Sequence, residues 1–87
     1  MAERLPILYI KPGCPWCDEA IEFLDAHGIG YQQKDVTRDD AARAELHRKS
    51  GQTKAPMLDW HGDILADFGV DELVPFLRER EVQLEDS

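Results

Sequence analysis

The only two cysteines of the chain, Cys14 and Cys17, stand two residues apart in the stretch KPGCPWC. Two thiols at this spacing can form a redox couple or supply half of a four-ligand zinc site. A structural disulfide is a weak interpretation, because a bridge that closes so short a loop constrains little of the unfolded chain. The pair therefore predicts thiol chemistry, with zinc binding as the alternative.

The residues after the first cysteine predict an α-helix from Pro15 to His27, since apolar residues recur at helical spacing and Gly28 can end it. Cys14 then lies at the helix N-terminus, where unpaired backbone N–H groups and the positive end of the helix dipole stabilise a thiolate. We therefore predict that Cys14 is the nucleophile. Cys17, one turn along, is the predicted resolving thiol that attacks a mixed disulfide at Cys14.

Two side chains beside the cysteines are candidates for substrate contacts. Lys11 adds a positive charge to a mostly acidic chain and would attract an anionic thiol substrate, although a solvated loop lysine is an equally good interpretation. Trp16 is expected at the exposed start of the helix, where a large aromatic side chain has no core to join. We favour a substrate contact for Trp16 over core packing.

A structural zinc site needs two more ligands, which only the histidines His27, His47 and His61 offer. None of them shows ligand spacing, because they fall at a helix end, inside a polar helix and in a turn. We therefore expect three surface histidines and no metal.

The first half of the chain predicts two strands and two helices. Leu5–Ile10 is continuously apolar, as expected for a central strand that is covered on both faces. Tyr31–Val36 is mostly polar and suits a strand nearer the sheet edge. A second helix is expected to start at Thr37 as N-cap and to end at Gly51.

The second half predicts a hairpin and a last helix. Ala55–Trp60 and Asp63–Phe68 are expected to pair as antiparallel strands across a two-residue turn. The segment GVDELVPFLRER has an apolar stripe at helical spacing, but Pro75 forbids a hydrogen bond unless it lies in the first helical turn. The acidic tail from Glu81 onward is expected to fray.

The order β-α-β-α-β-β-α predicts an α/β fold with right-handed parallel crossovers and then a hairpin. We expect a four-stranded mixed sheet flanked by three helices. At 87 residues the chain is expected to form one domain, residues 1–87.

Composition narrows the function classes. A formal charge of −8 argues against nucleic acid and anionic membranes as partners, because both reward clustered Lys and Arg. No apolar run approaches the roughly 20 residues of a membrane span. Glu3 stands where a secretion signal has positive charge, so we expect a soluble cytoplasmic protein.

Together with the order of elements, three segments make the chain resemble the glutaredoxins, which have a thioredoxin-like fold and exchange disulfides using glutathione. YIKPGCPWC is similar to the family's strand, lysine and Cys-Pro-aromatic-Cys; SGQTKAPML to its Gly-x-x-Thr-Val-Pro segment; and FGVDEL to its Gly-x-Asp-Asp-Leu helix start. The resemblance runs from Leu5 to about Leu77. It implies glutathione as reductant, disulfide-containing or glutathionylated proteins as partners, and a monomer.

The resemblance also implies roles for single residues. Pro56 would follow a cis peptide bond, and Ala55 would pair its backbone with the substrate's cysteine. The glutathione contacts implied are Lys11, Trp16, Lys54, Ala55, Pro56, Gly69, Val70 and Asp71.

The chain departs from the family pattern in two places. Lys54 and Ala55 replace Thr-Val, and Phe68 replaces the first of two glycines before the last helix. We expect Phe68 to narrow the glutathione groove and Lys54 to add a carboxylate contact.

The leading function is a dithiol glutaredoxin that reduces protein disulfides and glutathione mixed disulfides. One alternative is a redoxin of the same chemistry that is reduced by thioredoxin reductase. A second is iron–sulfur binding, with one Cys14 thiolate from each of two protomers and glutathione completing the ligands. A bare interaction module is disfavoured by the intact cysteine pair.

Overall fold

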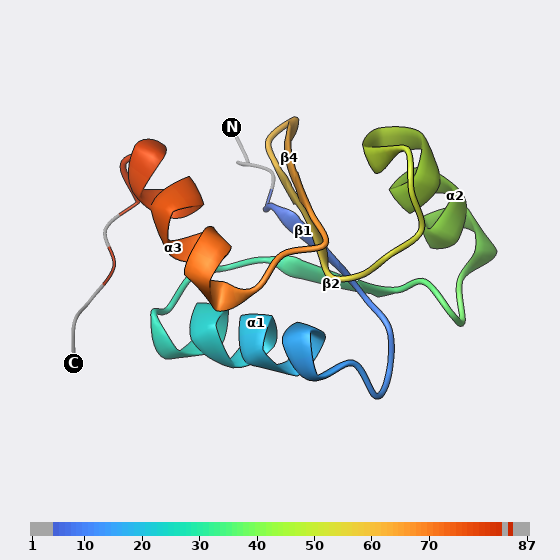
Figure 1. Ribbon diagram of the computed structural model, residues 1–87, viewed down its shortest axis with the longest axis horizontal. Helices are drawn as coiled ribbons and strands as arrows, with labels where there is room; N and C mark the ends of the chain where they lie inside the picture. The colour runs from blue at the N-terminus through green and yellow to red at the C-terminus, as the bar shows by residue number, and fades with distance from the viewer. Residues whose placement is uncertain (1–4, 83, 85–87) are drawn as a thin grey trace.

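The computed structural model describes residues 5–82 and 84 of the chain. The order of its strands and helices is the one predicted (Figure 1). The elements are β1 (Ile7–Ile10), α1 (Pro15–Ala26), β2 (Gln32–Asp35), α2 (Asp40–Ser50), β3 (Met57–Trp60), β4 (Asp63–Ala66) and α3 (Val70–Glu79).

The strands form one mixed sheet in the order β2-β1-β3-β4. β1 pairs in parallel with β2, with Ile7 opposite Gln32, and antiparallel with β3, with Leu8 opposite Leu58. β3 and β4 form the expected hairpin, with positive φ at both turn residues, His61 and Gly62, as a type I′ turn requires. The predicted central position of β1 and edge position of β2 are both confirmed.

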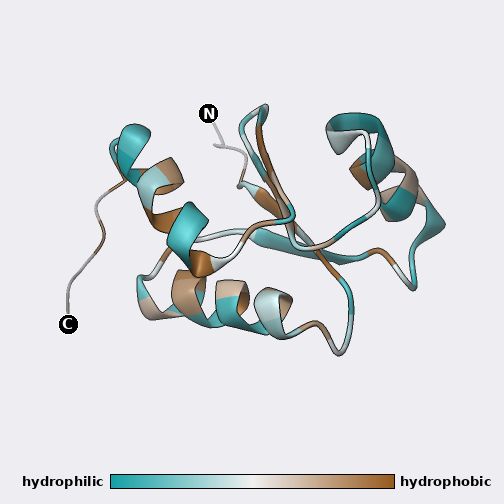
Figure 2. Cartoon of the chain, viewed as in Figure 1, coloured by the Kyte–Doolittle hydropathy of each residue, from teal (hydrophilic) through white to brown (hydrophobic). Residues whose placement is uncertain are grey.

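Residues of β1 alternate between two differently built faces. Leu8 and Ile10 belong to the larger apolar core with residues of α1 and α3, whereas Tyr9 belongs to a smaller cluster with residues of α2. Figure 1 shows α1 and α3 together on one side and α2 on the other. Figure 2 shows the corresponding difference in hydropathy, since α2 is mostly hydrophilic while α1 and α3 present brown residues to the core.

A polar network reinforces the α2 face. The Tyr9 hydroxyl donates a hydrogen bond to Glu45 Oε1 at 2.7 Å and accepts one from Lys49 Nζ at 2.7 Å. Lys49 also donates to Asp59 Oδ2 at 2.6 Å, and Lys34 Nζ donates to Glu45 at 3.0 Å. The network ties α2 to β1, β2 and β3.

The hydrogen bonds of this network lower the pKa values of two of its carboxylates, Glu45 and Asp59. Hydrogen bonds from Tyr9 and then Lys34 hold the pKa of Glu45 below its usual value. Burial opposes ionisation of Asp59, but the hydrogen bonds from Lys49 and the Gly62 backbone outweigh burial and lower the Asp59 pKa. The two carboxylates therefore favour the folded state while they stay ionised.

The start of α2 differs from the prediction. Its N-cap is Asp39, whose Oδ1 accepts the backbone N–H groups of Ala41 and Ala42 at 3.0 and 3.2 Å. Thr37 instead donates its hydroxyl and its backbone N–H to Asp35 Oδ1 at 2.6 and 2.8 Å. Because Asp35 engages Thr37 in a turn, the helix starts later; its predicted end at Gly51 is confirmed.

Pro75 lies inside α3, beyond the first helical turn. The expectation that the helix tolerates a proline only in its first turn is therefore wrong. Proline has no N–H to donate to the carbonyl of Asp71, four residues earlier. The helix continues because Leu73 and Leu77, one on each side of the proline, are completely buried in the larger core.

The segment after α3 is partly ordered against the core, contrary to the prediction of fraying. The Val82 backbone N–H donates to the Leu77 carbonyl at 3.1 Å, and Val82 and Leu84 pack on the larger core. The rest of the predicted frayed tail, 83 and 85–87, lies outside the described residues. Across the described part of the chain, no helix has the length and hydropathy to cross a membrane.

Candidate functional site

The loop between β1 and α1 places Cys14 at the N-cap of α1, as predicted. Gly13 turns the chain with φ of +76°, a conformation that favours glycine, and Pro15 occupies the first helical turn. Cys14 Sγ accepts the backbone N–H of Cys17 at 3.3 Å. The sulfur therefore receives one of the amide groups that the start of a helix leaves unpaired.

The two cysteines differ in exposure. Cys14 is partly exposed, whereas the Cys17 side chain is completely buried. Burial, reinforced by the hydrogen bond and charge of Cys14, raises the pKa of Cys17 to about 12. Cys17 is therefore a protonated thiol at neutral pH, and Cys14 is the thiol that a disulfide in solution can reach.

The loop before β3 lies against Cys14. The peptide bond between Ala55 and Pro56 is cis, as predicted, and Pro56 is completely buried. Cys14 Sγ lies 3.9 Å from the Ala55 carbonyl oxygen. A substrate sulfur bonded to Cys14 is thus next to the backbone of Ala55.

Lys54, on the same loop, is mostly exposed, and its Nζ lies 4.0 Å from Asp67 Oδ2. The Lys54 ammonium, which was expected to contact a glutathione carboxylate, therefore lies near a carboxylate of this chain. Asp67 comes directly after β4, and its contact with Lys54 is not visible in the local sequence.

Trp16 is 51% exposed, as expected for a contact residue. It lines a groove with the N-terminus of α3, where Gly69 is the N-cap and supplies no side-chain cap. The structure therefore brings the predicted contacts Trp16, Gly69, Val70 and Asp71 together. It adds the carboxylates of Glu19 and Glu72, which the sequence analysis did not name. This Trp16 groove, of about 280 Å³, is lined by Trp16, Glu19, Gly69, Val70, Asp71 and Glu72.

Lys11 lies in a different depression, the basic pocket, which also has a volume of about 280 Å³. Its other lining residues are Val36, Thr37 and Arg43. Arg43 comes from α2 and was missed by sequence reasoning, because nothing local connects it with Lys11. The parallel pairing of β1 and β2 places the segments that follow both strands at one end of the sheet.

Phe68 does not narrow the groove, so that prediction is wrong. Its side chain is completely buried and belongs to the larger core with Leu8, Leu58 and Leu73. Burial of a large aromatic side chain stabilises the fold. Because the Phe68 side chain points into the core, it leaves the N-terminus of α3 open at Gly69.

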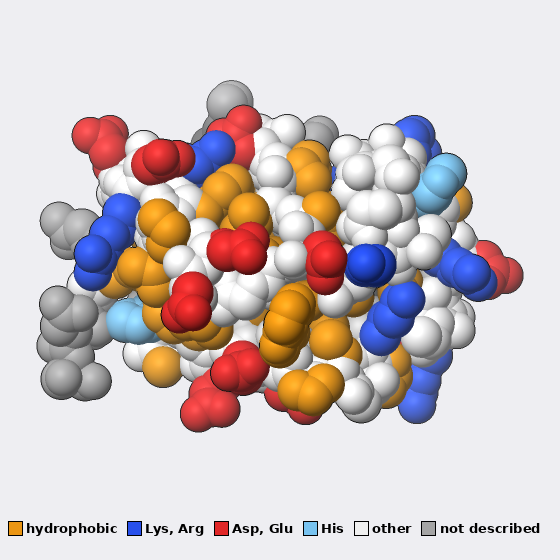
Figure 3. Space-filling model, viewed as in Figure 1, with side chains coloured by type: hydrophobic (Ala, Val, Ile, Leu, Met, Phe, Trp, Pro, Cys, Tyr) orange, Lys and Arg blue, Asp and Glu red, His pale blue; other side chains and the backbone are white. Residues whose placement is uncertain are grey.

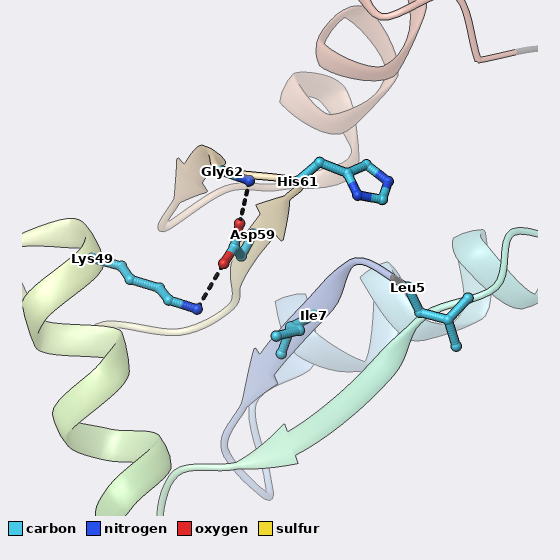
Figure 4. Close-up of a pocket in the computed structure, with 6 residues that line it drawn as sticks. All are labelled: Leu5, Ile7, Lys49, Asp59, His61 and Gly62. Atoms are coloured by element: carbon cyan, nitrogen blue, oxygen red, sulfur yellow. Dashed lines mark hydrogen bonds and ion pairs between the residues drawn. The ribbon is translucent and has the colours of Figure 1, made fainter. Parts of the chain in front are cut away.

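A depression of about 510 Å³ lies elsewhere (Figure 4). It is formed by the start of β1 and the β3–β4 turn, whereas Cys14 follows the end of β1. Lys49 and the Gly62 backbone both direct their hydrogen bonds to Asp59 there. These polar groups are already paired, so we assign the depression a structural role.

Charge is divided across the site. Figure 3 shows acidic side chains over α1 and the start of α3, whereas several Lys and Arg side chains lie on the side of the molecule that carries α2. Among residues 5–82 and 84, His, Cys, Asp and Glu side chains form no group of three that could hold a metal ion.

A family model described as Glutaredoxin matches residues 7–65, more than half of the chain. The chain belongs to the glutaredoxin family. It is 30% identical to an uncharacterized glutaredoxin-like 8.6 kDa protein in a rubredoxin operon of Clostridium pasteurianum. The match runs over 66 residues and covers 76% of this chain and 88% of that relative.

Solved structures agree with this glutaredoxin assignment. The thioredoxin-like protein BC3987 matches with a TM-score of 0.76 and 30% identity, over 83% of this chain and 99% of that one. A buckwheat glutaredoxin–glutathione complex matches with a TM-score of 0.67 and 23% identity, over 87% of this chain and 70% of that one. The thioredoxin-like fold is therefore confirmed, and family and fold support a thiol–disulfide oxidoreductase with a redox-active dithiol.

Proposed function

We propose that this glutaredoxin uses glutathione to reduce protein disulfides and glutathione mixed disulfides. The observation that carries the proposal is the placement of Cys14 Sγ, which is partly exposed, accepts the Cys17 N–H and lies beside the Ala55 carbonyl. A sulfur in this position can attack a disulfide whose own backbone lies along the Ala55–Pro56 loop.

The proposed reaction begins with the Cys14 thiolate. It attacks one sulfur of the target disulfide, forms a new S–S bond and expels the other sulfur as a thiolate, which takes up a proton. Cys17 then gives up its proton and attacks Cys14 Sγ, releasing the target's second thiol and leaving a Cys14–Cys17 disulfide. Two glutathione thiols reduce that disulfide and are themselves oxidised to glutathione disulfide.

The burial of Cys17 affects the second step. The Cys17 pKa is raised to about 12, with burial as the largest cause and the neighbouring Cys14 sulfur as the second. A mixed disulfide at Cys14 removes the second cause but not the first, so attack by Cys17 remains slow. A second glutathione therefore has time to release a glutathionylated Cys14 directly, which favours glutathione mixed disulfides as substrates.

Glutathione has carboxylates at both ends, and the chain offers a positive feature for each. Lys11 would meet one carboxylate in the basic pocket, and the uncapped N-terminus of α3 would meet the other. Lys54 would contribute only when it leaves Asp67. The proposed contact residues are Lys11, Trp16, Lys54, Ala55, Pro56, Gly69, Val70 and Asp71. The reaction suits a monomer in the cytoplasm, where reduced thiols are maintained.

The test is reduction of a glutathione mixed disulfide of a small thiol, coupled to glutathione reductase and NADPH. We expect Cys14→Ser to lose all activity, because serine is not a nucleophile in this exchange. Cys17→Ser is expected to retain it, since a second glutathione replaces the resolving thiol. Inactive wild-type protein in this assay would refute the glutathione dependence.

The alternative reductant is tested with the same protein. Phe68 stands where the glutaredoxin pattern has the first of two glycines, so thioredoxin reductase is the second electron donor to examine. NADPH oxidation with thioredoxin reductase in place of glutathione and glutathione reductase would favour this alternative. Absorbance of a cluster after anaerobic reconstitution with iron and sulfide would instead support iron–sulfur binding.

A further inference from the structure

We propose that a groove between α1 and α3 docks a lysine- or arginine-rich segment of the target protein, next to the disulfide presented to Cys14. The inference rests on the proposed function and names the class of protein substrate. We call this depression, of about 450 Å³, the acidic groove; its lining residues are Glu19, Glu22, Phe23, Ala26, Val70 and Asp71.

The acidic groove adjoins the reactive cysteine through the Trp16 groove. The two depressions share Glu19, Val70 and Asp71, so they form one surface that starts at Trp16 and runs along α1. Trp16 lies between the two cysteines in sequence and is half exposed. A polypeptide whose disulfide reaches Cys14 can therefore place its next residues over this surface.

The lining of the acidic groove combines two kinds of side chain. Phe23, Ala26 and Val70 provide apolar surface, and Glu19, Glu22 and Asp71 provide carboxylates. Lysine and arginine have the matching composition, because their hydrocarbon stems cover apolar surface while the charged ends reach polar groups. An arginine or lysine over the Phe23 ring would gain a further cation–π attraction.

The carboxylates of this surface have no cation of their own. Within the described ranges 5–82 and 84, none of Glu19, Glu22, Asp71 and Glu72 takes part in an ion pair. Like charges held in one groove repel each other, and a basic segment relieves that repulsion. Opposite charges at short range attract more strongly near a protein surface than in bulk water.

The same charges disfavour other occupants. Glutathione carries net negative charge, and its proposed contacts on this surface, Trp16, Gly69, Val70 and Asp71, all line the Trp16 groove. Glu22, Phe23 and Ala26 of the acidic groove therefore remain available to a basic segment. Nucleic acid is repelled by unpaired carboxylates. A basic polypeptide is thus the occupant that the charge and the apolar surface both fit, and its association is accelerated by electrostatic attraction.

The test uses reduced protein and three synthetic peptides, each with one disulfide followed by a run of lysines, serines or glutamates. Stopped-flow fluorescence without glutathione gives the rate constant of disulfide exchange. We expect the lysine peptide to react about tenfold faster than the glutamate peptide at low salt, a difference that shrinks as salt screens the charges. Equal rates for the three peptides would overturn the proposal.

A charge-reversed variant localises the effect. Glu19→Lys with Glu22→Lys should abolish or invert the preference for the lysine peptide. The matched control is Glu79→Lys with Glu81→Lys, which changes the net charge equally but lies at and beyond the last residue of α3; it should keep the preference. The proposal is refuted if the first pair keeps the preference or if both pairs lose it equally.

Binding without chemistry separates this inference from the proposed function. A Cys14→Ser/Cys17→Ser protein is titrated with the lysine peptide carrying serine in place of cysteine, and amide NMR shifts are followed. Shifts at Glu19, Glu22 and Val70 support docking even if no disulfide exchange occurs. Absence of shifts there, or shifts confined to α2, contradicts docking even if the exchange reaction is fast.

Discussion

The two faces of the sheet differ both in what holds them together and in the charge they carry near Cys14. The α1–α3 face is built on the larger apolar core and is acidic on its surface, with Glu19 and Asp71. The α2 face has a smaller apolar cluster, the Tyr9 network and a basic pocket at Lys11. The proposed nucleophile, Cys14, is therefore open to approach across two surfaces of opposite charge.

This difference suggests a division of labour between the two surfaces. The proposed glutathione contacts reach from Lys11 in the basic pocket to the Trp16 groove, whereas the proposed basic target segment fits the acidic groove. Because Lys11 lines only the basic pocket and Glu22 lines only the acidic groove, substitutions at these two positions can alter one function and spare the other. The following predictions test the comparison in order of decreasing effect.

The largest expected effect is on stability. Leu73→Ala on the α1–α3 face should cost about 3 to 4 kcal/mol of unfolding free energy, within the range for buried leucines. Leu46→Ala on the α2 face should cost about 1 kcal/mol less, because Leu46 belongs to the smaller apolar cluster and loses fewer apolar contacts. Both residues are completely buried. Urea unfolding measures both, and equal losses would contradict the difference between the faces.

The next effect is on glutathione use. Lys11→Met should lower kcat/KM for a glutathione mixed disulfide about tenfold, because a hydrogen bond to a charged group is lost, and the change should appear mainly in KM. Arg48→Met removes the same charge from an exposed position of α2 outside the basic pocket and is the control. Equal effects of both variants would mean that only net charge matters.

Acid should weaken the α2 face selectively. The pKa of Asp59 in the folded state is lower than its ordinary value of 3.8, so its contribution is complete above that value and is lost as pH falls through the folded pKa. Asp59→Asn should therefore flatten the decline of the unfolding free energy below about pH 4. Chemical denaturation at several pH values measures this. An unchanged dependence of the unfolding free energy on pH would show that Asp59 does not cause the acid sensitivity.

The smallest effect concerns Lys54. Asp67→Asn removes the carboxylate that lies 4.0 Å from Lys54 Nζ and should free the lysine for glutathione. We expect kcat/KM for the glutathione mixed disulfide to rise about threefold, since exposed ion pairs of this kind are worth less than about 1 kcal/mol. Asp63→Asn, which affects a pair with Arg80 elsewhere, is the control. A fall in kcat/KM would show that Asp67 positions Lys54 productively.

Much of the fold was readable from local sequence. The apolar run of β1, the His61–Gly62 turn and the end of α2 at Gly51 each have a strong local cause, and all three predictions were confirmed. The start of α2 was missed because Asp35 holds Thr37 in a turn and Asp39 caps the helix instead, and the sequence alone does not rank Thr37 and Asp39 as caps. Pro75 was misjudged because burial of its neighbours outweighed one missing hydrogen bond.

The site was predictable only in part, for a physical reason. Cys14 and Cys17 share one helix turn, and their positions follow from helix geometry. The cis bond at Pro56 was predicted only through the family resemblance. Arg43, Asp67 and Glu72 reach the site from three other elements or loops, so only the tertiary fold reveals them. Phe68 was misassigned because the sequence does not say which way a residue between two elements points.

The positions of the two tryptophans provide an optical consequence. Trp16 stands between the cysteines and is half exposed, whereas Trp60 ends β3, packs on the larger core and contacts the His61 ring at a centroid distance of 5.5 Å. Emission from Trp16 thus senses the oxidation state of the dithiol, and emission from Trp60 senses whether the hairpin is intact. Trp16→Phe and Trp60→Phe proteins would each retain one of these signals, so that oxidation and unfolding can be followed separately without an attached dye.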